Sequence, residues 1–577
     1  MVEELTWMVG GEQGEGIDST GATFASLMNR QGYFLYGYRN FGSRIKGGHT
    51  NYKLRIATHP VAAQSDHVDI LLAFDQPTIN INAKELREGA VVIADERVHP
   101  KLPEGIRASL YVVPLTQIAE EHGNRIMKNM VSLGATAGLM GLPVEAFYEL
   151  MQKRFGRKGN EVVEQNMQAI AAGAAYIRQH YEKLEGFDLA PADGKSRYLM
   201  IGNEAMALGA LTAGCRVMTA YPITPASDIM EYLVRKFPKV GGVMIQTEDE
   251  ISAVNMAIGA SYAGARAMTA TSGPGFSLMA EGIGLSGMSE TPIVVIDTER
   301  TGPSTGMPTR HEQSDLNMAI FGTHGDVQRI VLSPSTLEDA FYITADAFNL
   351  ADAYQVPVIM LADFALCEAL QTTEGLDPTQ VRIDRGSIMT DEQLMQLPGG
   401  GQFKRYAITP TGISPRTFPS QVNGIYQADG LEHGEDGHPT EDFDVRQKQM
   451  SKRLAKLAGF HYDRAIDYEG PQQPDLLVVG FGSTRGVIDE ALAQLRQEGH
   501  AVARLTLRCL WPFPAEETTP YLEAAKHIVI VENNAGAQLA GLIHREVGYH
   551  GKSSSLSQYN GRTFLPSQLV RLLKEWL

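Results

Sequence analysis

The most constraining feature of this sequence is a rhythm in which short apolar runs alternate with segments of helical spacing. In the first stretch of the chain the runs are LTWMVG, HVDILLAFD, AVVIADE and ASLYVVPL, with helical spacing over residues 19–31. Apolar runs separated by helices are typical of parallel strands joined by crossover helices. The pattern therefore predicts a doubly wound α/β domain, with helices on both faces of a sheet.

The same rhythm returns twice further along the chain. From residue 198 the runs are GGVMIQTEDE, ARAMTATSGPG, ETPIVVIDTE and VPVIMLAD, and from residue 471 they are LLVVGFG, HAVARLTL and HIVIVEN. A helix is expected over residues 484–498, and a closing amphipathic helix in SQLVRLLKEWL. The predicted fold class is therefore α/β with three doubly wound domains, a number that 577 residues can accommodate.

Changes in composition predict the domain boundaries. The first domain is expected over residues 1–186 and is followed by a Pro/Asp/Gly linker, FDLAPADGKSR, over residues 187–197. The second domain is expected over residues 198–370 and the third over residues 471–577. Residues 371–470 lose the rhythm and are rich in proline and glycine, which predicts an irregular connecting region. A loop of that length is more often functional than idle.

Charge and cysteine content exclude several classes of protein. A net charge of -17 argues against nucleic acid or an anionic membrane as the main partner. The N-terminus has no signal-peptide pattern and no apolar run reaches membrane-spanning length, so a cytoplasmic protein is expected. Cys215, Cys367 and Cys509 are far apart, which excludes a disulfide framework, a zinc ribbon and a self-contained iron–sulfur site. We expect no metal site in this chain, and any cluster that carries electrons would belong to another chain.

The stretch AYPITPASD, residues 220–228, predicts a rigid elbow between a strand and a helix. Pro222 and Pro225 each fix their own φ and keep the preceding residue extended. Such an elbow holds the side chain of Thr224 at the end of a strand, where a ligand of an α/β sheet is expected.

A second pattern is IQTEDEISAVNMAIGASYAGARAMTATSGPG, in which Glu250 begins a helix with small residues along one face. A glycine-rich turn, TSGPG, follows the next strand and includes Ser272 and Gly273. Two interpretations stay open for this helix. The small residues could form an ordinary packing seam, with an acidic first turn that suits the helix dipole, or they could let another body approach closely.

Two loops of the first domain carry further candidates. GGEQGEG follows a strand and resembles a phosphate cradle, with Gly14 and Gly16 as candidate contacts, although a tight turn without a ligand explains it equally. Its glycines do not have the spacing of a dinucleotide fingerprint. In SRIKGGH, Arg44 and Lys46 place positive charge on a loop that is either a binding loop or a solvated basic turn.

Taken together, these motifs resemble the α subunit of 2-oxoacid:ferredoxin oxidoreductases, and most closely the 2-oxoglutarate type with a γ domain fused in front of α. The resemblance rests on Glu250 with Gly259 and TSGPG, on YPITP, on GPSTGMPTR at residues 302–310, and on GGEQGEG and SRIKGGH. VENNAG at residues 531–536 is similar to the transketolase-like C-terminal domain of that family. The resemblance implies a γ domain, a thiamine diphosphate pyrimidine-binding domain and a transketolase C-terminal-like domain, in that order.

The resemblance also assigns roles at the cofactor. Glu250 is implied as the carboxyl partner of the aminopyrimidine ring, a role that suits a partly buried glutamate with a raised pKa. Glu248 competes for this role, but the spacing of Glu250 to Gly259 matches the family pattern better. The other implied cofactor contacts are Tyr221, Pro222, Ile223, Ser272 and Gly273.

For the substrates, the resemblance implies that Thr224 and Arg310 bind the 1-carboxylate of a 2-oxoacid, so that Glu250, Thr224 and Arg310 form the catalytic set. The alternative for Arg310 is an interface salt bridge. Lys46, with Arg44, is implied at the distal carboxylate, and Gly14 and Gly16 at coenzyme A. His311 and Asp315 in HEQSD are interpreted as ordinary helix-start polarity, because two ligands are too few for a metal.

A missing motif predicts that the active site is shared between chains. The sequence has no GDG followed by asparagine about 25–30 residues later, the pattern expected to hold magnesium and diphosphate in thiamine enzymes. A β subunit is therefore expected to supply Mg²⁺, the diphosphate half-site and a 4Fe–4S cluster, in an (αβ)₂ assembly. The implied reaction is reversible, coenzyme A-dependent oxidative decarboxylation of 2-oxoglutarate, with electrons passed to ferredoxin.

Other functions stay open at this point. The same reaction on pyruvate or branched-chain 2-oxoacids would use the same contacts to the 1-carboxylate. A flavin- or NAD-dependent oxidoreductase subunit would use the first domain for a nucleotide. A catalytically silent scaffold is the third alternative, and it has no need of Glu250, Thr224 and Arg310 together.

Overall fold

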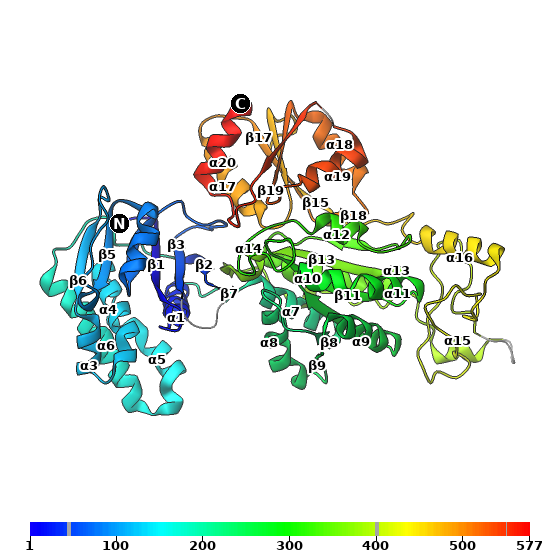
Figure 1. Ribbon diagram of the computed structural model, residues 1–577, viewed down its shortest axis with the longest axis horizontal. Helices are drawn as coiled ribbons and strands as arrows, with labels where there is room; N and C mark the ends of the chain where they lie inside the picture. Colours follow the sequence, from blue (N-terminus) through cyan, green and yellow to red (C-terminus); the bar gives the residue numbers. More distant parts are fainter. Residues whose placement is uncertain (43–47, 398–402, 550) are drawn as a thin grey trace. The chain divides into compact units, whose positions relative to one another are not determined.

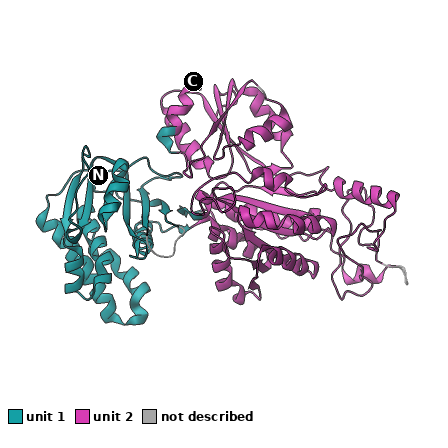
Figure 2. Ribbon diagram, in the orientation of Figure 1, with its two compact units in different colours: residues 1–200, 368–374, 565–568 teal, residues 201–367, 375–564, 569–577 magenta. Residues whose placement is uncertain are grey.

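The computed structural model describes residues 1–42, 48–397, 403–549 and 551–577. The chain forms two compact units (Figure 2). Unit 1 comprises residues 1–200, 368–374 and 565–568, and unit 2 comprises residues 201–367, 375–564 and 569–577. The fold class predicted from the sequence, α/β with parallel sheets covered by helices, is confirmed (Figure 1).

Unit 1 is built on an eight-stranded sheet with the order β6-β5-β4-β1-β3-β2-β14-β7. Strands β1, β4, β5 and β6 are parallel, as the apolar runs predict, whereas β2 and β3 form an antiparallel hairpin beside β1. The strands are β1 (Glu4–Glu12), β2 (Phe34–Asn40), β3 (His49–Ala57), β4 (Val68–Ala73), β5 (Leu86–Asp95), β6 (Ser109–Val113), β7 (Tyr198–Met200) and β14 (Leu370–Thr373). The helices are α1 (Ile17–Arg30), α2 (Gln76–Asn82), α3 (Leu115–Glu121), α4 (Lys128–Met140), α5 (Tyr148–Phe155) and α6 (Asn160–His180).

Two features of unit 1 differ from the sequence prediction. The hairpin β2/β3 makes its sheet mixed. The sequence does not predict this hairpin, because its strands FLYGYRN and HTNYKLRIA contain too many polar residues to form apolar runs. Strand β7 begins at Tyr198, where the sequence predicts the second domain to start, yet it pairs with β14 in the sheet of unit 1. Helices α4 and α6 pack closely, since a Cβ on Gly134 would lie 1.9 Å from the backbone oxygen of Ile170.

Unit 2 contains a seven-stranded sheet with the order β18-β12-β13-β11-β10-β8-β9, in which every strand except β18 is parallel. Its strands are β8 (Cys215–Ala220), β9 (Val243–Gln246), β10 (Arg266–Thr271), β11 (Ile293–Glu299), β12 (Ile330–Leu332), β13 (Pro357–Asp363) and β18 (Cys509–Trp511). Its helices are α7 (Gly202–Thr212), α8 (Ser227–Lys236), α9 (Glu250–Tyr262), α10 (Gly273–Leu278), α11 (Ala280–Met288), α12 (Leu316–Phe321), α13 (Leu337–Tyr354) and α14 (Phe364–Glu368).

A second sheet of unit 2 has the order β15-β17-β16-β19-β20, with β15 antiparallel at its edge. The strands are β15 (Ile466–Glu469), β16 (Leu476–Gly480), β17 (Val502–Leu507), β19 (His527–Glu532) and β20 (Ser553–Ser557). Helices α17 (Thr484–Gln497), α18 (Ala515–Ala524) and α19 (Gln538–Val547) accompany it, and α20 (Pro566–Leu573) lies near the end of the chain.

The connecting region of residues 371–470 is mostly irregular, with two α-helices, α15 (Asp391–Met395) and α16 (Phe443–Ala455), among its described residues. Helix α16 was not predicted from the sequence. It is tied to the connection between α11 and β11 by the buried side chain of Lys452, whose ammonium group lies 2.6 Å from a carboxylate oxygen of Glu290. Among the described residues, the structure contains no helix long and apolar enough to cross a membrane.

Candidate active site

The sequence motifs of the second stretch meet at one edge of the seven-stranded sheet. Strands β8, β10, β11 and β13 are neighbours and parallel, so their carboxyl ends lie on the same side. They end at Ala220, Thr271, Glu299 and Asp363. The YPITP elbow, the TSGPG turn and the loop over residues 300–310 follow the first three of these ends. Ligands of open α/β sheets bind at this edge, which makes it the candidate site.

The elbow is held through its backbone. The Asn203 side chain donates a hydrogen bond of 2.8 Å to the carbonyl oxygen of Pro225, and the Arg300 guanidinium donates one of 2.7 Å to that of Thr224. The Thr224 side chain is half-buried, and its hydroxyl makes no hydrogen bond to any residue that the structure describes. The backbone of Thr224 is therefore fixed while its hydroxyl stays available to a ligand. Tyr221 and Pro222 are exposed and Ile223 is half-buried.

Glu250 is the first residue of α9, and its side chain is only 7% exposed. The neighbouring Asp249 caps the helix by accepting a hydrogen bond of 2.7 Å from the backbone N–H of Ser252, and Glu248 is exposed. Within the part of the chain that the structure describes, the Glu250 carboxyl group has no hydrogen-bond partner. Although most of the side chain is buried, its carboxyl oxygens reach the surface of the described structure, so a ligand can contact them there.

The TSGPG turn packs directly against the side chain of Glu250. A Cβ on Gly275 would lie 2.6 Å from the Oε1 atom of Glu250, which is closer than real Cβ contacts. Ser272 behaves differently from the other members of the turn, because its side chain is fully buried and its hydroxyl donates a hydrogen bond of 2.7 Å to the carbonyl oxygen of Thr298. Ser272 therefore ties β10 to β11, and its hydroxyl is already engaged within the protein.

Arg310 ends a loop that closes on itself. Its backbone N–H donates a hydrogen bond of 3.0 Å to the carbonyl oxygen of Met307, and its carbonyl oxygen accepts one of 3.0 Å from Thr301. The half-buried side chain packs on Gly561, whose added Cβ would lie 3.1 Å from the Cβ of Arg310. The guanidinium also donates a hydrogen bond of 2.9 Å to the backbone of Thr309. The loop thus holds the start of the Arg310 side chain in a defined place.

Sequence reasoning missed a cluster of ionisable residues at the same edge. Asp297 and Glu299, near the end of β11, are fully buried, and Arg300 follows them directly. Glu299 accepts a hydrogen bond of 2.9 Å from the backbone N–H of Asp315. Burial, reinforced by the nearby Asp315 carboxylate, raises the pKa of both Asp297 and Glu299. The available signal was IDTER, which places three ionisable residues at the end of an otherwise apolar strand.

The interpretation of His311 and Asp315 in HEQSD as ordinary polar residues at the start of a helix is wrong, because His311 is buried and the Asp315 side chain does not cap the helix. His311 is 1% exposed, and its Nδ1 atom accepts a hydrogen bond of 3.3 Å from the backbone N–H of Ala365. Asp315 makes no side-chain cap to α12, and its Oδ2 atom would lie 2.7 Å from a Cβ on Gly273. Burial, with the Glu312 carboxylate, raises the pKa of Asp315 to about 6. The described residues contain no group of three or more histidine, cysteine or acidic side chains suited to a metal.

The candidate residues of the first domain belong to unit 1 and are described by themselves. Gly14 and Gly16 have φ angles of +106° and +80°, which favour glycine. A Cβ on Gly16 would lie 2.3 Å from the side-chain nitrogen of Asn129, so this turn is packed by the protein itself. Arg44 and Lys46 lie outside the described residues.

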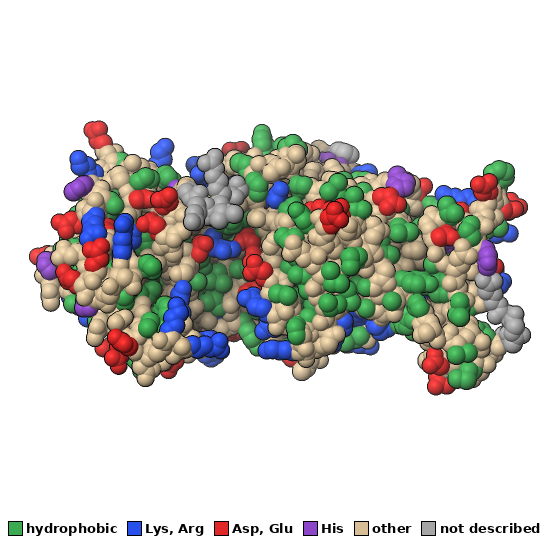
Figure 3. Space-filling model, turned by 60° about the horizontal axis from the view of Figure 1, so that its bottom comes forward, with side chains coloured by type: hydrophobic (Ala, Val, Ile, Leu, Met, Phe, Trp, Pro, Cys, Tyr) green, Lys and Arg blue, Asp and Glu red, His purple; other side chains and the backbone are tan. Residues whose placement is uncertain are grey.

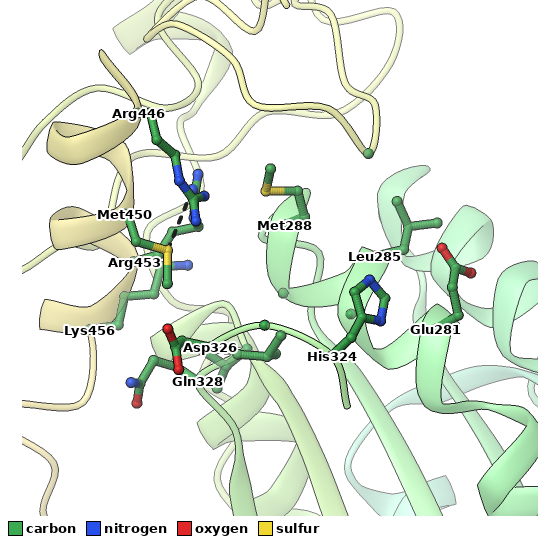
Figure 4. A pocket seen from close by; sticks show the side chains of 16 residues that line it. Glu281, Leu285, Met288, His324, Asp326, Gln328, Arg446, Met450, Arg453 and Lys456 are labelled. Atoms are coloured by element: carbon green, nitrogen blue, oxygen red, sulfur yellow. Dashed lines mark hydrogen bonds between the residues drawn. The ribbon is translucent and has the colours of Figure 1, made fainter. Parts of the chain in front are cut away.

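A cavity of about 240 Å³ lies elsewhere in unit 2, between α11, the segment 324–328 and α16 (Figure 4). Its basic side chains are already paired: Arg446 and Arg453 contact Glu432, and Lys456 contacts Glu290. The cavity does not include the residues of the sheet edge described above.

The chain matches three protein-family models in sequence. Residues 6–176 match "Pyruvate ferredoxin/flavodoxin oxidoreductase", residues 208–452 match "Pyruvate flavodoxin/ferredoxin oxidoreductase, thiamine diP-bdg", and residues 474–569 match "Pyruvate:ferredoxin oxidoreductase core domain II". The candidate site at the sheet edge falls within the thiamine diphosphate-binding match.

Two relatives and a solved structure agree with these matches. The "2-oxoacid:ferredoxin oxidoreductase 2, subunit alpha" of Aeropyrum pernix is 31% identical over 100% of this chain and 98% of its own length. The "2-oxoglutarate synthase subunit KorA" of Methanothermobacter thermautotrophicus is 34% identical over 65% of this chain and 98% of its own length. The structure of "2-oxoglutarate:ferredoxin oxidoreductase from Magnetococcus marinus with 2-oxoglutarate, coenzyme A and succinyl-CoA bound" is 36% identical, covers 100% of both chains and superposes with a TM-score of 0.91.

Proposed function

Because the chain belongs to the α subunits of the 2-oxoacid:ferredoxin oxidoreductases, we propose that it acts in the coenzyme A-dependent oxidative decarboxylation of 2-oxoglutarate to succinyl-CoA and carbon dioxide. The choice of 2-oxoglutarate is supported by the 2-oxoglutarate synthase relative and by the ligands named for the Magnetococcus marinus structure. The reaction is reversible, and its electrons pass to ferredoxin through a 4Fe–4S cluster on a β subunit.

The observation that carries this proposal is the largely buried Glu250 side chain, whose carboxyl group has no hydrogen-bond partner among the described residues. Thiamine diphosphate, when bound, supplies the nucleophilic carbon that attacks the ketone of the oxoacid. Glu250 would share one proton with a ring nitrogen of the pyrimidine, in a hydrogen bond that the burial of its side chain shields from water. Gly275 packs against this side chain without a Cβ and so lets the carboxyl group keep its place at the sheet edge.

The 1-carboxylate of the oxoacid is assigned to Thr224 and Arg310. The free hydroxyl of Thr224 on a fixed backbone is a preorganised donor, and the fork of Arg310 matches a planar carboxylate. Tyr221, Pro222, Ile223 and Gly273 are proposed to line the cofactor, with Ser272 contributing only its backbone. From the sequence alone, Lys46 and Arg44 are proposed at the distal carboxylate, and Gly14 and Gly16 at coenzyme A.

We propose further that a β subunit completes the site in an (αβ)₂ assembly and supplies Mg²⁺, the diphosphate half-site and the cluster. Helix α9, which begins at Glu250, exposes apolar side chains: Ile251 is 49% exposed and Met256 is 42% exposed. A Cβ on Gly259 of this helix would meet nothing within 4 Å. Figure 3 shows hydrophobic side chains gathered on the lower face of unit 2, and a broad apolar area of this kind suits a protein partner. The three cysteines are buried thiols, which supports a cluster held by the partner chain.

The test is Glu250→Gln in the complex co-expressed with its partner, with Glu248→Gln as the matched control two residues away. The readout is anaerobic, coenzyme A-dependent reduction of a viologen dye with 2-oxoglutarate. Loss of the carboxyl group should lower the rate roughly 10²–10⁴-fold, the usual range for an acid–base group, whereas the exposed Glu248 should matter less than about twofold. Equal rates for the two variants would remove Glu250 from its role.

Pyruvate is the second candidate substrate, favoured by the names of the three matching family models. The same assay separates the two by their kcat/KM values. Preference for pyruvate would keep the reaction and the roles of Glu250, Thr224 and Arg310, and it would remove the dicarboxylate role of Lys46.

A further inference from the structure

Arg300 is a buried cation that contacts two loops of the candidate site. Its side chain is 7% exposed and leaves the end of β11 directly. One guanidinium nitrogen donates a hydrogen bond of 2.7 Å to the carbonyl oxygen of Thr224 in the elbow. The other terminal nitrogen donates one of 3.4 Å to the carbonyl oxygen of Thr305, in the loop that ends at Arg310. One rigid group therefore connects the two loops that carry Thr224 and Arg310.

Arg300 lies near two carboxyl groups, yet its hydrogen bonds go to backbone carbonyl groups. Two carboxyl groups, those of Asp297 and Asp315, are near enough to counter the lowering of the Arg300 pKa by burial. Arg300 nevertheless makes no ion pair with either of them within the described residues, and both Asp297 oxygens lack a hydrogen bond there. Its terminal donors are directed at carbonyl groups of the loops instead. Arginine's planar fork can hold two acceptors at a fixed separation, which the single ammonium group of lysine cannot do.

We propose that Arg300 is a positioning residue for the 2-oxoacid: it fixes the elbow that presents the Thr224 hydroxyl and sets the loop of Arg310 beside it, so that both donors meet one carboxylate. This inference rests on the proposed function, since it assigns Thr224 and Arg310 to the 1-carboxylate. Arg300 contacts the backbone on which the substrate donors are held, and its influence on the oxoacid passes through Thr224 and Arg310.

The proposal makes a selective kinetic prediction. In the complex with its partner, Arg300→Lys keeps the positive charge but loses one of the two loop contacts, so the KM for the 2-oxoacid should rise at least 10-fold. The KM for coenzyme A and the affinity for thiamine diphosphate should change less than threefold. Arg329→Lys is the matched control, because Arg329 is equally buried and donates a hydrogen bond of 3.3 Å to the carbonyl oxygen of Ala319. That variant should leave the KM for the oxoacid unchanged.

A double-mutant cycle tests whether Arg300 acts through Thr224. Thr224→Val removes one of the two donors that Arg300 positions. In that background Arg300→Lys should therefore raise the KM by a smaller factor than the at least 10-fold expected in the wild type, because only the route through Arg310 is left. Full additivity of the two losses, or parallel rises in both KM values, would overturn the proposal. If Arg300→Lys does not assemble, Arg300→Gln, which keeps one planar amide donor, is measured in the same cycle. Wild-type complex that turns over no 2-oxoacid would instead overturn the proposed function.

Discussion

Two glutamates of unit 2, Glu290 and Glu299, are both fully buried and yet have opposite electrostatic environments. Glu290 lies between α11 and β11, where the connecting region packs against the seven-stranded sheet. Glu299 ends β11 at the candidate site. Two glutamate side chains with the same burial are therefore found in two different environments.

The surroundings differ in their counter-charges. Glu290 contacts the ammonium groups of Lys452 at 2.6 Å and Lys456 at 2.8 Å. Burial alone would raise the pKa of Glu290, but the two ammonium groups outweigh it and hold that pKa well below its usual range. Around Glu299, burial and the carboxyl groups of Asp315 and Asp297 act in the same direction and raise its pKa.

The comparison separates a structural charge cluster from a site. Around Glu290 the buried charges are neutralised by partners, so the cluster fixes the connecting region to the sheet. At the sheet edge three acidic side chains are buried together beside the guanidinium of Arg300, and burial outweighs that one cation and raises their pKa values. Such an arrangement is costly for folding and is typical of functional sites. The sheet edge is also where Glu250 and the Thr224 hydroxyl have no hydrogen bond to a described residue.

The largest expected effect is on the structural cluster. Glu290→Gln leaves two buried ammonium groups without a counter-charge, and breaking a buried pair in this way costs about 3–5 kcal/mol of stability. The urea unfolding midpoint should fall accordingly. Glu281→Gln, at an exposed glutamate of α11, is the control and should shift the midpoint little. A Glu290→Gln midpoint equal to that of the control would show that the cluster does not anchor the fold.

A smaller effect is expected from Asp315→Asn, and it depends on pH. The folded-state pKa of Asp315 is about 6, above the ordinary value of 3.8, because burial and Glu312 disfavour its charged form. The raised pKa gives wild type a stability contribution that is complete below about pH 4 and is lost as the pH rises through 6. Asparagine does not titrate.

The variant should therefore gain stability relative to wild type between pH 4.5 and 7.5, by up to about 2–3 kcal/mol. The measurement is the difference in thermal unfolding midpoint between the two proteins across that range. A difference that stays constant with pH would mean that Asp315 has an ordinary pKa, and the contrast between the two clusters would weaken.

The smallest effect is expected from Glu299→Gln. Burial and the carboxyl groups of Asp315 and Asp297 raise the pKa of Glu299, which favours its neutral form. Glutamine is close in shape to that form and retains the oxygen that accepts from the backbone of Asp315. Stability should change by no more than about 1 kcal/mol, because no ion pair is lost. The urea midpoint is compared with that of Glu290→Gln. Equal losses in the two variants would show that both glutamates are charged and paired alike.

Much of the fold followed from local signals. Buried parallel strands such as VPVIMLAD are continuous apolar runs, and these predicted the parallel parts of the three sheets. The hairpin β2/β3 was missed because its strands mix polar with apolar residues. Helix α16 was missed because FDVRQKQMSKRLA is charged nearly all round, and the partner of its Lys452 is 162 residues away in sequence.

The candidate site, like the fold, has parts that the sequence predicted and parts that it did not. Prolines and glycines have local meaning, so YPITP and TSGPG predicted the turns that gather at the sheet edge. The contacts of Arg300 with Thr224 and of Asp315 with Glu299 depend on the packing of separate loops at the ends of parallel strands. No local pattern encodes those contacts, which is why His311 and Asp315 were interpreted as helix-start residues.

The central claim is that this chain holds only the pyrimidine half of a thiamine diphosphate site. The most direct measurement is anaerobic, coenzyme A-dependent reduction of a viologen dye with 2-oxoglutarate, by this chain alone and by the chain co-expressed with its partner. We expect no turnover by the chain alone and clear turnover, chiefly on 2-oxoglutarate, by the complex. Turnover by the isolated chain would contradict the claim, because the whole site would then lie within these 577 residues.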